Sequence, residues 1–154
     1  MIEKAIFLDI DGVLNSEEYY IHRQKDWSGK FKFSYDLDEI AIQRLNKIIE
    51  NTKINIVLSS TWRLFQINEV INSLKYKGFK YDIEYVTTFI PMDRGLQILK
   101  FIKNNNVKDY IVIDDDDFDI KAYIPTENFV HTSFKYGLTD KNVDYIINYF
   151  NKKV

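Results

Sequence analysis

The sequence predicts an α/β protein, a Rossmann-like three-layer α/β/α sandwich with a mainly parallel five-stranded sheet. Short apolar runs alternate along the chain with segments whose apolar residues recur every three to four positions, as they do on one face of a helix. The apolar runs are continuous, which is typical of strands that helices cover on both faces. Several of these runs also end in acidic or hydroxyl residues.

Five segments have the character of buried strands. Each is a short run rich in Ile, Val, Phe, Leu or Tyr. These segments are residues 4–10, 54–58, 82–86, 110–113 and 128–131.

Four segments have helical periodicity and lie between or after the strands. The first begins at Asp36, which with Glu39 forms a start similar to a capping box. The second has its apolar stripe at residues 67–74 and closes near Gly78. The third starts near Asp93, and the last is capped near residue 139 or 140.

Composition indicates one globular domain over residues 1–154. Hydrophobic residues make up 45% of the chain and charged residues 29%, and the net charge of -2 excludes a strongly basic nucleic-acid coat. Cysteine is absent, so disulfides and thiolate metal sites are excluded. No apolar run approaches the length of about 18 residues typical of a membrane span. We therefore expect no membrane partner and, without a signal-peptide pattern, a cytoplasmic location.

Acidic and hydroxyl residues follow three of the predicted strands. Because ligands of open α/β sheets bind outside the carboxyl ends of the strands, we expect these side chains to converge. Clustered carboxylates repel unless a cation compensates, and all-oxygen ligands suit Mg²⁺. The residues are Asp9 and Asp11 after the first strand, Ser59 and Ser60 after the second, and Asp114, Asp115, Asp116 and Asp117 after the fourth.

Four of these elements, in this order, resemble the motifs of the haloacid dehalogenase (HAD) superfamily of phosphohydrolases. Residues 9–15 (DIDGVLN) resemble the first signature, Ser59 the second and Arg94 the third. Asp114 and Asp115 resemble the acidic fourth motif. The stretches LDIDGVLN, LSSTWR, VIDD and GLT further resemble the small HAD domains of Swiss-army-knife RNA-repair proteins.

The resemblance implies a two-step reaction through an aspartyl-phosphate. Asp9 would attack the phosphoryl group, and Asp11 would act as the general acid and then as the general base. Mg²⁺ would be held by the Asp9 carboxylate, the Asp11 main-chain carbonyl and Asp115. Asp114 would assist as a further ligand or by orienting water. Arg94 would balance charge on the phosphoryl group and on Asp9.

Further residues are candidates for holding the substrate phosphate. The resemblance gives Ser59 a hydrogen bond to a phosphoryl oxygen, with Ser60 as its competitor one residue later. Whichever serine does not fill this role caps the next helix. Arg63 is either a phosphate ligand or a surface ion-pair residue. Gly12 allows the sharp turn after Asp9, and the backbone amides there add to the phosphate cradle.

Residues 15–35 interrupt the alternation of strands and helices and form a short flap. The resemblance predicts a turn and a small hairpin here and no large cap domain. Aromatic and basic residues interleave in this segment, as in surfaces that stack bases, although the rings can equally pack a hairpin onto the domain. An open site would admit a bulky substrate, or a second copy of the chain could cover it in a homodimer.

We therefore predict a Mg²⁺-dependent phosphomonoester hydrolase. Its expected substrate is a nucleotide or the terminal phosphate of a polynucleotide. One alternative is a PIN-like metal-dependent nuclease, which also gathers acids at strand ends but needs neither Ser59 nor Arg94. Another is a phospho-accepting signalling module similar to a receiver domain.

Overall fold

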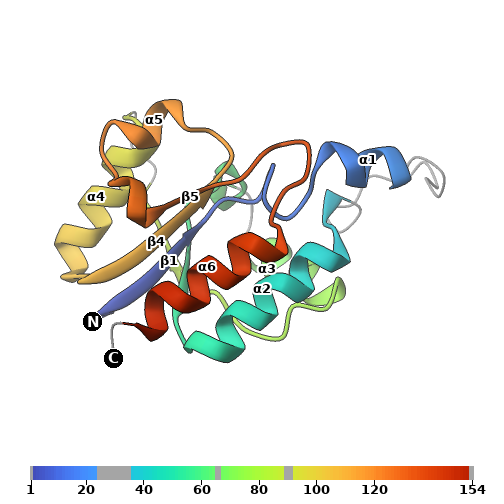
Figure 1. Ribbon diagram of the computed structural model, residues 1–154, viewed down its shortest axis with the longest axis horizontal. Coiled ribbons are helices and arrows are strands. Elements are labelled where there is room, and N and C mark those ends of the chain that lie inside the picture. Colours follow the sequence, from blue (N-terminus) through green and yellow to red (C-terminus); the bar gives the residue numbers. More distant parts are fainter. Residues whose placement is uncertain (1, 24–35, 65–66, 89–91, 153–154) are drawn as a thin grey trace.

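The computed structural model describes residues 2–23, 36–64, 67–88 and 92–152 (Figure 1). Five strands of this part of the chain form one sheet in which every pairing is parallel. The sheet order is β3-β2-β1-β4-β5, so the predicted fold class is confirmed. The strands are β1 (Lys4–Leu8), β2 (Asn55–Leu58), β3 (Tyr85–Val86), β4 (Asp109–Asp114) and β5 (Phe129–His131).

This strand order places a switch point between β1 and β4. The chain runs outward from β1 to β3 on one side and then crosses to β4 on the other side. In open sheets of this kind, ligands bind in the crevice at the carboxyl ends of the two strands that flank the switch point. The topology therefore predicts a ligand site at the residues that follow Leu8 and Ile113.

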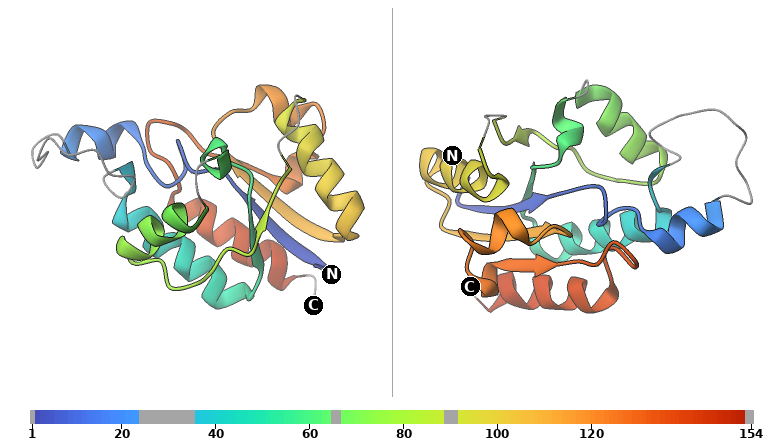
Figure 2. Two further views of the ribbon diagram at one scale, coloured as in Figure 1. Left: turned by 180° about the vertical axis from the view of Figure 1, so that it is seen from behind. Right: turned by 90° about the horizontal axis from the view of Figure 1, so that it is seen from above.

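Helices cover both faces of the sheet (Figure 2). One core joins α2 (Glu39–Thr52), α3 (Ile67–Tyr76) and α6 (Asp140–Asn151) to the sheet. The other core contains apolar residues of α4 (Arg94–Asn105) and α5 (Phe118–Lys121). Successive side chains of β1 alternate between the two cores, which fixes the strand in the middle layer.

The helix boundaries follow local capping chemistry. Helix α2 begins at Glu39, after the Asp38 carboxylate that accepts a hydrogen bond from the Ile40 amide at 3.0 Å. The predicted start at Asp36 is therefore wrong by two residues. Helix α6 has the predicted cap at Thr139, which forms a capping box with Asn142.

Strand β3 and the segment after β1 also differ from the sequence-based expectation. Strand β3 is confined to Tyr85–Val86 instead of residues 82–86. Helix α1 (Glu17–Arg23) occupies the first part of the segment for which a turn and a small hairpin were predicted. The Ser16 hydroxyl accepts from the Tyr19 amide at 3.1 Å, and Glu17 and Glu18 follow in the first turn, where acidic residues favour a helix. Residues 24–35 lie outside the described part of the chain.

Short 3-10 turns complete the connections. They include η2 (Thr61–Leu64), two residues after β2, and η3 (Thr126–Asn128), directly before β5. Within the described ranges, no helix combines the length and the apolar character needed to cross a membrane.

Candidate active site

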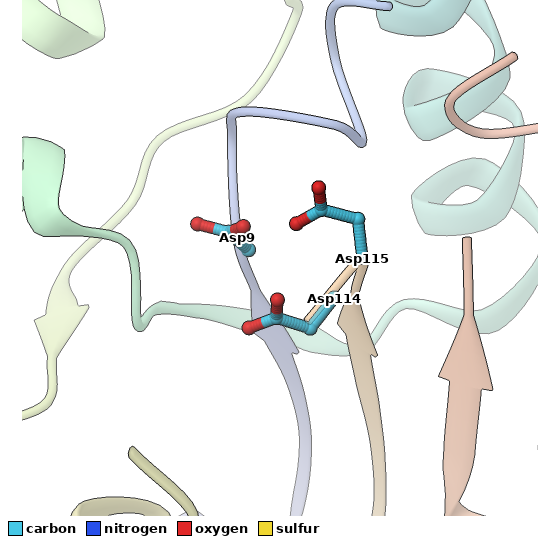
Figure 3. Close-up of side chains that lie close together, drawn as sticks. All are labelled: Asp9, Asp114 and Asp115. Carbon is cyan, nitrogen blue, oxygen red and sulfur yellow. The ribbon is translucent and has the colours of Figure 1, made fainter. Parts of the chain in front are cut away.

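Three carboxylates meet at the carboxyl ends of β1 and β4 (Figure 3). Asp9 follows β1, and its amide continues the ladder to β4 by donating to the Ile113 carbonyl at 3.0 Å. Asp114 ends β4, and Asp115 follows it. One oxygen atom from each carboxylate lies within 4.8 Å of one from each of the others. Topology and register thus bring together residues more than a hundred positions apart.

The Arg94 guanidinium lies beside two of these carboxylates. Arg94 is the first residue of α4, and its Nη1 is 2.6 Å from Asp114 Oδ2 and 3.5 Å from Asp9 Oδ2. Asp9 is only 4% exposed and Asp114 is fully buried. The cluster therefore has three carboxylates and one guanidinium, which contacts two of them, and it remains short of positive charge.

The pKa values in the cluster reflect this imbalance. Burial and the neighbouring Asp114 charge raise the pKa of Asp9 to about 8, although Arg94 acts to lower it. Burial and Asp114 also raise the pKa of Asp115. Burial lowers the pKa of Arg94, but the charges of Asp114 and Asp9 outweigh this and raise it. The protein alone therefore does not stabilise all three carboxylates in their charged form.

A divalent cation fits this donor set. The three grouped side chains offer only carboxylate oxygens, which Mg²⁺ prefers over softer ligands. The raised pKa of Asp9 indicates the missing positive charge that such an ion would supply. The Asp11 carboxylate is not part of the group, and the sequence-based expectation assigned only its main-chain carbonyl to the metal.

Asp11 is held by hydrogen bonds to both of its carboxylate oxygens. Asn15 Nδ2 donates to Oδ1 at 2.9 Å, and Trp62 Nε1 donates to Oδ2 at 3.0 Å. The same Asn15 side chain accepts from the Gly12 amide at 2.8 Å and donates to the Asp36 carbonyl at 2.8 Å. These contacts fix the orientation of an otherwise exposed carboxylate.

Gly12 makes the turn that separates Asp9 from the following loop. Its φ of +78° is in the left-handed region that glycine adopts readily. A Cβ at this position would overlap the carboxylate of Asp115. The Gly12 amide bonds to Asn15 and its carbonyl accepts from Thr132 Oγ1 at 2.7 Å. Gly12 therefore allows Asp115 to lie close to the loop that follows Asp9. The Gly12 amide already has Asn15 as its hydrogen-bond partner.

The hydroxyl residues after β2 differ in their environment. Ser59 is buried next to β1, with its amide donating to the Leu8 carbonyl at 2.9 Å. The Ser60 hydroxyl accepts from the Trp62 amide at 3.2 Å at the start of η2, which is the capping geometry expected for one of the two serines. The backbone of Arg63 lies in η2, but its side chain is outside the described part of the structure.

A cavity of about 510 Å³ opens over the cluster. It is lined by Asp9, Asp11, Thr61, Arg94, Asp115, Asp116 and Phe134. Four predicted catalytic or metal-binding residues therefore share one cavity, and Asp114 lies beneath it in contact with Arg94. The cavity is large enough for a phosphoryl group together with part of the molecule that carries it.

Comparison with known families identifies the family of this chain. A family model described as "HAD domain in Swiss Army Knife RNA repair proteins" matches residues 5–143. The chain belongs to this HAD family. Among solved structures, it is similar to a haloacid dehalogenase-like family hydrolase from Streptococcus pneumoniae, at 13% sequence identity and a TM-score of 0.46, over 94% of this chain and 90% of that chain. A search of the curated proteins finds no match.

Sequence reasoning missed several residues of this candidate site. Trp62 is not among the predicted site residues, yet its indole donates a hydrogen bond to Asp11. Thr61 and Phe134 line the cavity without having been singled out as candidates. The signal available for Thr61 was its place after two serines at a strand end, whereas Phe134 lies in a loop far along the chain and carried no motif.

Proposed function

We propose that this HAD domain is a Mg²⁺-dependent phosphomonoester hydrolase in which Asp9 is the nucleophile. The observation that carries the proposal is the position of the Asp9 carboxylate, at the floor of an open cavity and beside both Arg94 and a further carboxylate pair. Arg94 and a divalent cation held by the three carboxylates would keep Asp9 charged, and a charged carboxylate is suited to attack on phosphorus.

In the first step, a carboxylate oxygen of Asp9 forms a bond to phosphorus as the bond to the leaving oxygen breaks. Asp11, in its protonated form, donates its proton to that leaving oxygen and releases the alcohol. Arg94 offsets negative charge on the phosphoryl oxygens, and the Ser59 hydroxyl donates a hydrogen bond to one of them. The product is an alcohol and an aspartyl-phosphate on Asp9.

In the second step, Asp11 takes a proton from a water molecule. The water oxygen attacks phosphorus, and the bond between phosphorus and the Asp9 oxygen breaks. Inorganic phosphate leaves, and Asp9 returns to its carboxylate form. The hydrogen bonds from Asn15 and Trp62 keep Asp11 in one orientation for both proton transfers.

The metal site of this proposal consists of residues already near one another. The carboxylates of Asp9, Asp114 and Asp115, with the main-chain carbonyl of Asp11, would hold Mg²⁺. The ion supplies positive charge that lowers the cost of bringing a phosphate dianion to a carboxylate.

The proposed substrate is a nucleotide or the terminal phosphate of a nucleic acid. The open cavity and the family's description as a domain of RNA repair proteins support this choice. Membership of the HAD family also favours a phosphomonoesterase over the PIN-like nuclease and the receiver-like module.

The test is hydrolysis of phosphomonoesters with Mg²⁺ by the wild-type chain and by Asp9→Asn. We expect Asp9→Asn to lower kcat by at least about a thousandfold, because nucleophile loss removes the covalent route. Asp82→Asn changes a surface acid that pairs with Lys75 and serves as the control. A closed circular single strand and an oligonucleotide with a terminal phosphate separate nuclease from phosphatase activity. Cleavage of the circle, or an active Asp9→Asn variant, would overturn the proposal.

A further inference from the structure

Phe134 is an exposed aromatic residue at the edge of the cavity over the carboxylate cluster. It lies in the loop between β5 and α6, is 49% exposed, and lines the same cavity as Asp9, Asp11 and Arg94. Exposed aromatic rings beside a polar reaction site offer a surface for a flat, apolar part of a ligand.

The loop that carries Phe134 is fixed against the catalytic loop. Its tip is closed by a hydrogen bond from the Gly137 amide to the Ser133 carbonyl at 2.7 Å, and the Leu138 amide donates to the Val13 carbonyl at 2.9 Å. The carbonyl of Phe134 itself accepts from the Glu17 amide at 2.8 Å. A ring on a backbone held in this way costs little ordering entropy when a ligand stacks on it.

Further rings extend from Phe134 onto α1, which lies beside this loop (Figure 1). The Tyr20 ring is 6.4 Å from the Phe134 ring, and the Tyr19 ring is 5.7 Å from the Tyr20 ring, between centroids. Two acidic residues, Glu17 and Glu18, begin the same helix. The surface next to the cavity is therefore aromatic without being strongly basic.

We propose that Phe134 is the stacking platform for the nucleobase of the nucleotide whose phosphate is hydrolysed at Asp9. The inference rests on the proposed function and adds to it the residue that selects base-bearing substrates. Base–aromatic stacking tolerates any base, because every base has a flat π-face. A phosphotyrosine has a single ring, whereas the rings of Phe134, Tyr20 and Tyr19 suit a terminal nucleotide with a neighbouring base. Lys135 offsets part of the charge of Glu17 and Glu18, so this surface lacks the run of basic residues that binds a long phosphate backbone.

The experiment compares a base-bearing with a base-free substrate in the full chain. We would measure kcat/KM with Mg²⁺ for adenosine 5′-monophosphate, adenosine 3′-monophosphate and ribose 5-phosphate, in wild type, Phe134→Ala, Phe134→Trp and Tyr76→Ala. Tyr76 is an exposed aromatic residue on α3 and serves as the matched control. We expect Phe134→Ala to lower the preference for the better nucleotide over ribose 5-phosphate by about tenfold. Phe134→Trp should retain the preference, and Tyr76→Ala should leave it unchanged.

Three results would overturn the platform. The first is an unchanged preference in Phe134→Ala, and the second is an equal loss of preference in Tyr76→Ala. The third requires a phosphotyrosine peptide as a further substrate: it is a fall in kcat/KM of Phe134→Ala for the peptide but not for the nucleotides. If wild type hydrolyses no phosphomonoester, the proposed function fails separately. Binding of adenosine 5′-monophosphate to Asp9→Asn, with and without Phe134→Ala, then decides the platform: a loss of affinity of about tenfold supports it, and equal affinity rejects it.

Discussion

The indole Nε1 of Trp62 donates a hydrogen bond of 3.0 Å to Asp11 Oδ2 across a separation of 51 residues. Asn15 donates to the other oxygen of the same carboxylate. The proposed acid–base group is therefore held from both sides, by its own motif and by the turn after β2. Trp62 acts through Asp11 and is a positioning residue.

Replacing Trp62 with Phe should slow turnover without unfolding the protein. The phenyl ring retains most of the buried packing, but one of two hydrogen bonds to a charged group is lost. Because such bonds contribute about 1.5–3 kcal/mol, we expect kcat to fall by about tenfold or more, with KM little changed. Steady-state kinetics over a range of pH measure this effect, since a misplaced acid–base group also changes the pH profile.

Tyr149→Phe is the matched control for this prediction. Tyr149 lies on α6 and does not line the cavity over the carboxylate cluster. The change removes a hydroxyl that accepts a hydrogen bond from Asn128 Nδ2 at 2.8 Å. Its kcat should equal that of wild type. If Trp62→Phe were as active as wild type at every pH, the indole would have only a packing role.

Replacing Arg94 with Met should destabilise the metal-free protein and abolish most activity. Asp114 is fully buried, and its partner at 2.6 Å would be lost. Breaking a buried pair on one side costs about 3 kcal/mol. Urea unfolding in a metal chelator measures the change in free energy of unfolding. Lys108→Met removes a solvent-exposed pair with Glu3 and should cost well below about 1 kcal/mol; similar losses in the two variants would contradict the buried-pair explanation.

The parallel sheet and the meeting of Asp9 with Asp115 could be predicted from sequence. Continuous apolar strands require cover on both faces, and parallel strands place their carboxyl ends at one edge. Register then follows from pairing β1 with β4, which aligns Leu8 with Ile113 just before the acids. The strand order supplied the remaining condition, because β1 and β4 are neighbours.

Contacts made by side chains across the fold could not be predicted in the same way. The bond between Trp62 and Asp11 depends on how η2 packs, which no local pattern specifies. Phe134 reaches the cavity only because its loop docks on the loop after Asp9. Helix α1, in contrast, had a local signal in Ser16 followed by two acidic residues, and the expectation of a hairpin obscured it.

Gly12→Ala should cost both stability and activity. Alanine at φ +78° is strained by about 1–2 kcal/mol, and its Cβ would overlap the Asp115 carboxylate. Gly78→Ala is the control, because Gly78 also has a positive φ but no atom lies within 4 Å of an added Cβ. Both variants should lower the free energy of unfolding, but only Gly12→Ala should lower kcat/KM. Equal activity in the two would show that Asp115 can move without consequence.

The Asp9 carboxyl should make metal-free stability depend on pH. Its pKa is raised from 3.8 to about 8 by burial and by Asp114, so the folded protein binds a proton that the unfolded chain has released. Its contribution to stability is fully present below the unfolded pKa, declines as pH rises, and is lost above about pH 8. Thermal unfolding in a chelator, followed between about pH 5 and pH 9, measures this decline, which should be smaller in Asp9→Asn.

Added Mg²⁺ should reverse this dependence, because the ion and the proton compete for Asp9. Below about pH 8, each decrease of one pH unit should weaken Mg²⁺ binding by up to about tenfold. Since a ligand stabilises the fold according to its concentration relative to its Kd, the increase in Tm produced by Mg²⁺ should be larger near pH 8.5 than near pH 6. Asp9→Asn should bind the ion more weakly and with less dependence on pH. An equal increase in Tm at both pH values would mean that the ion is held without Asp9, and the proposed metal site would then be wrong.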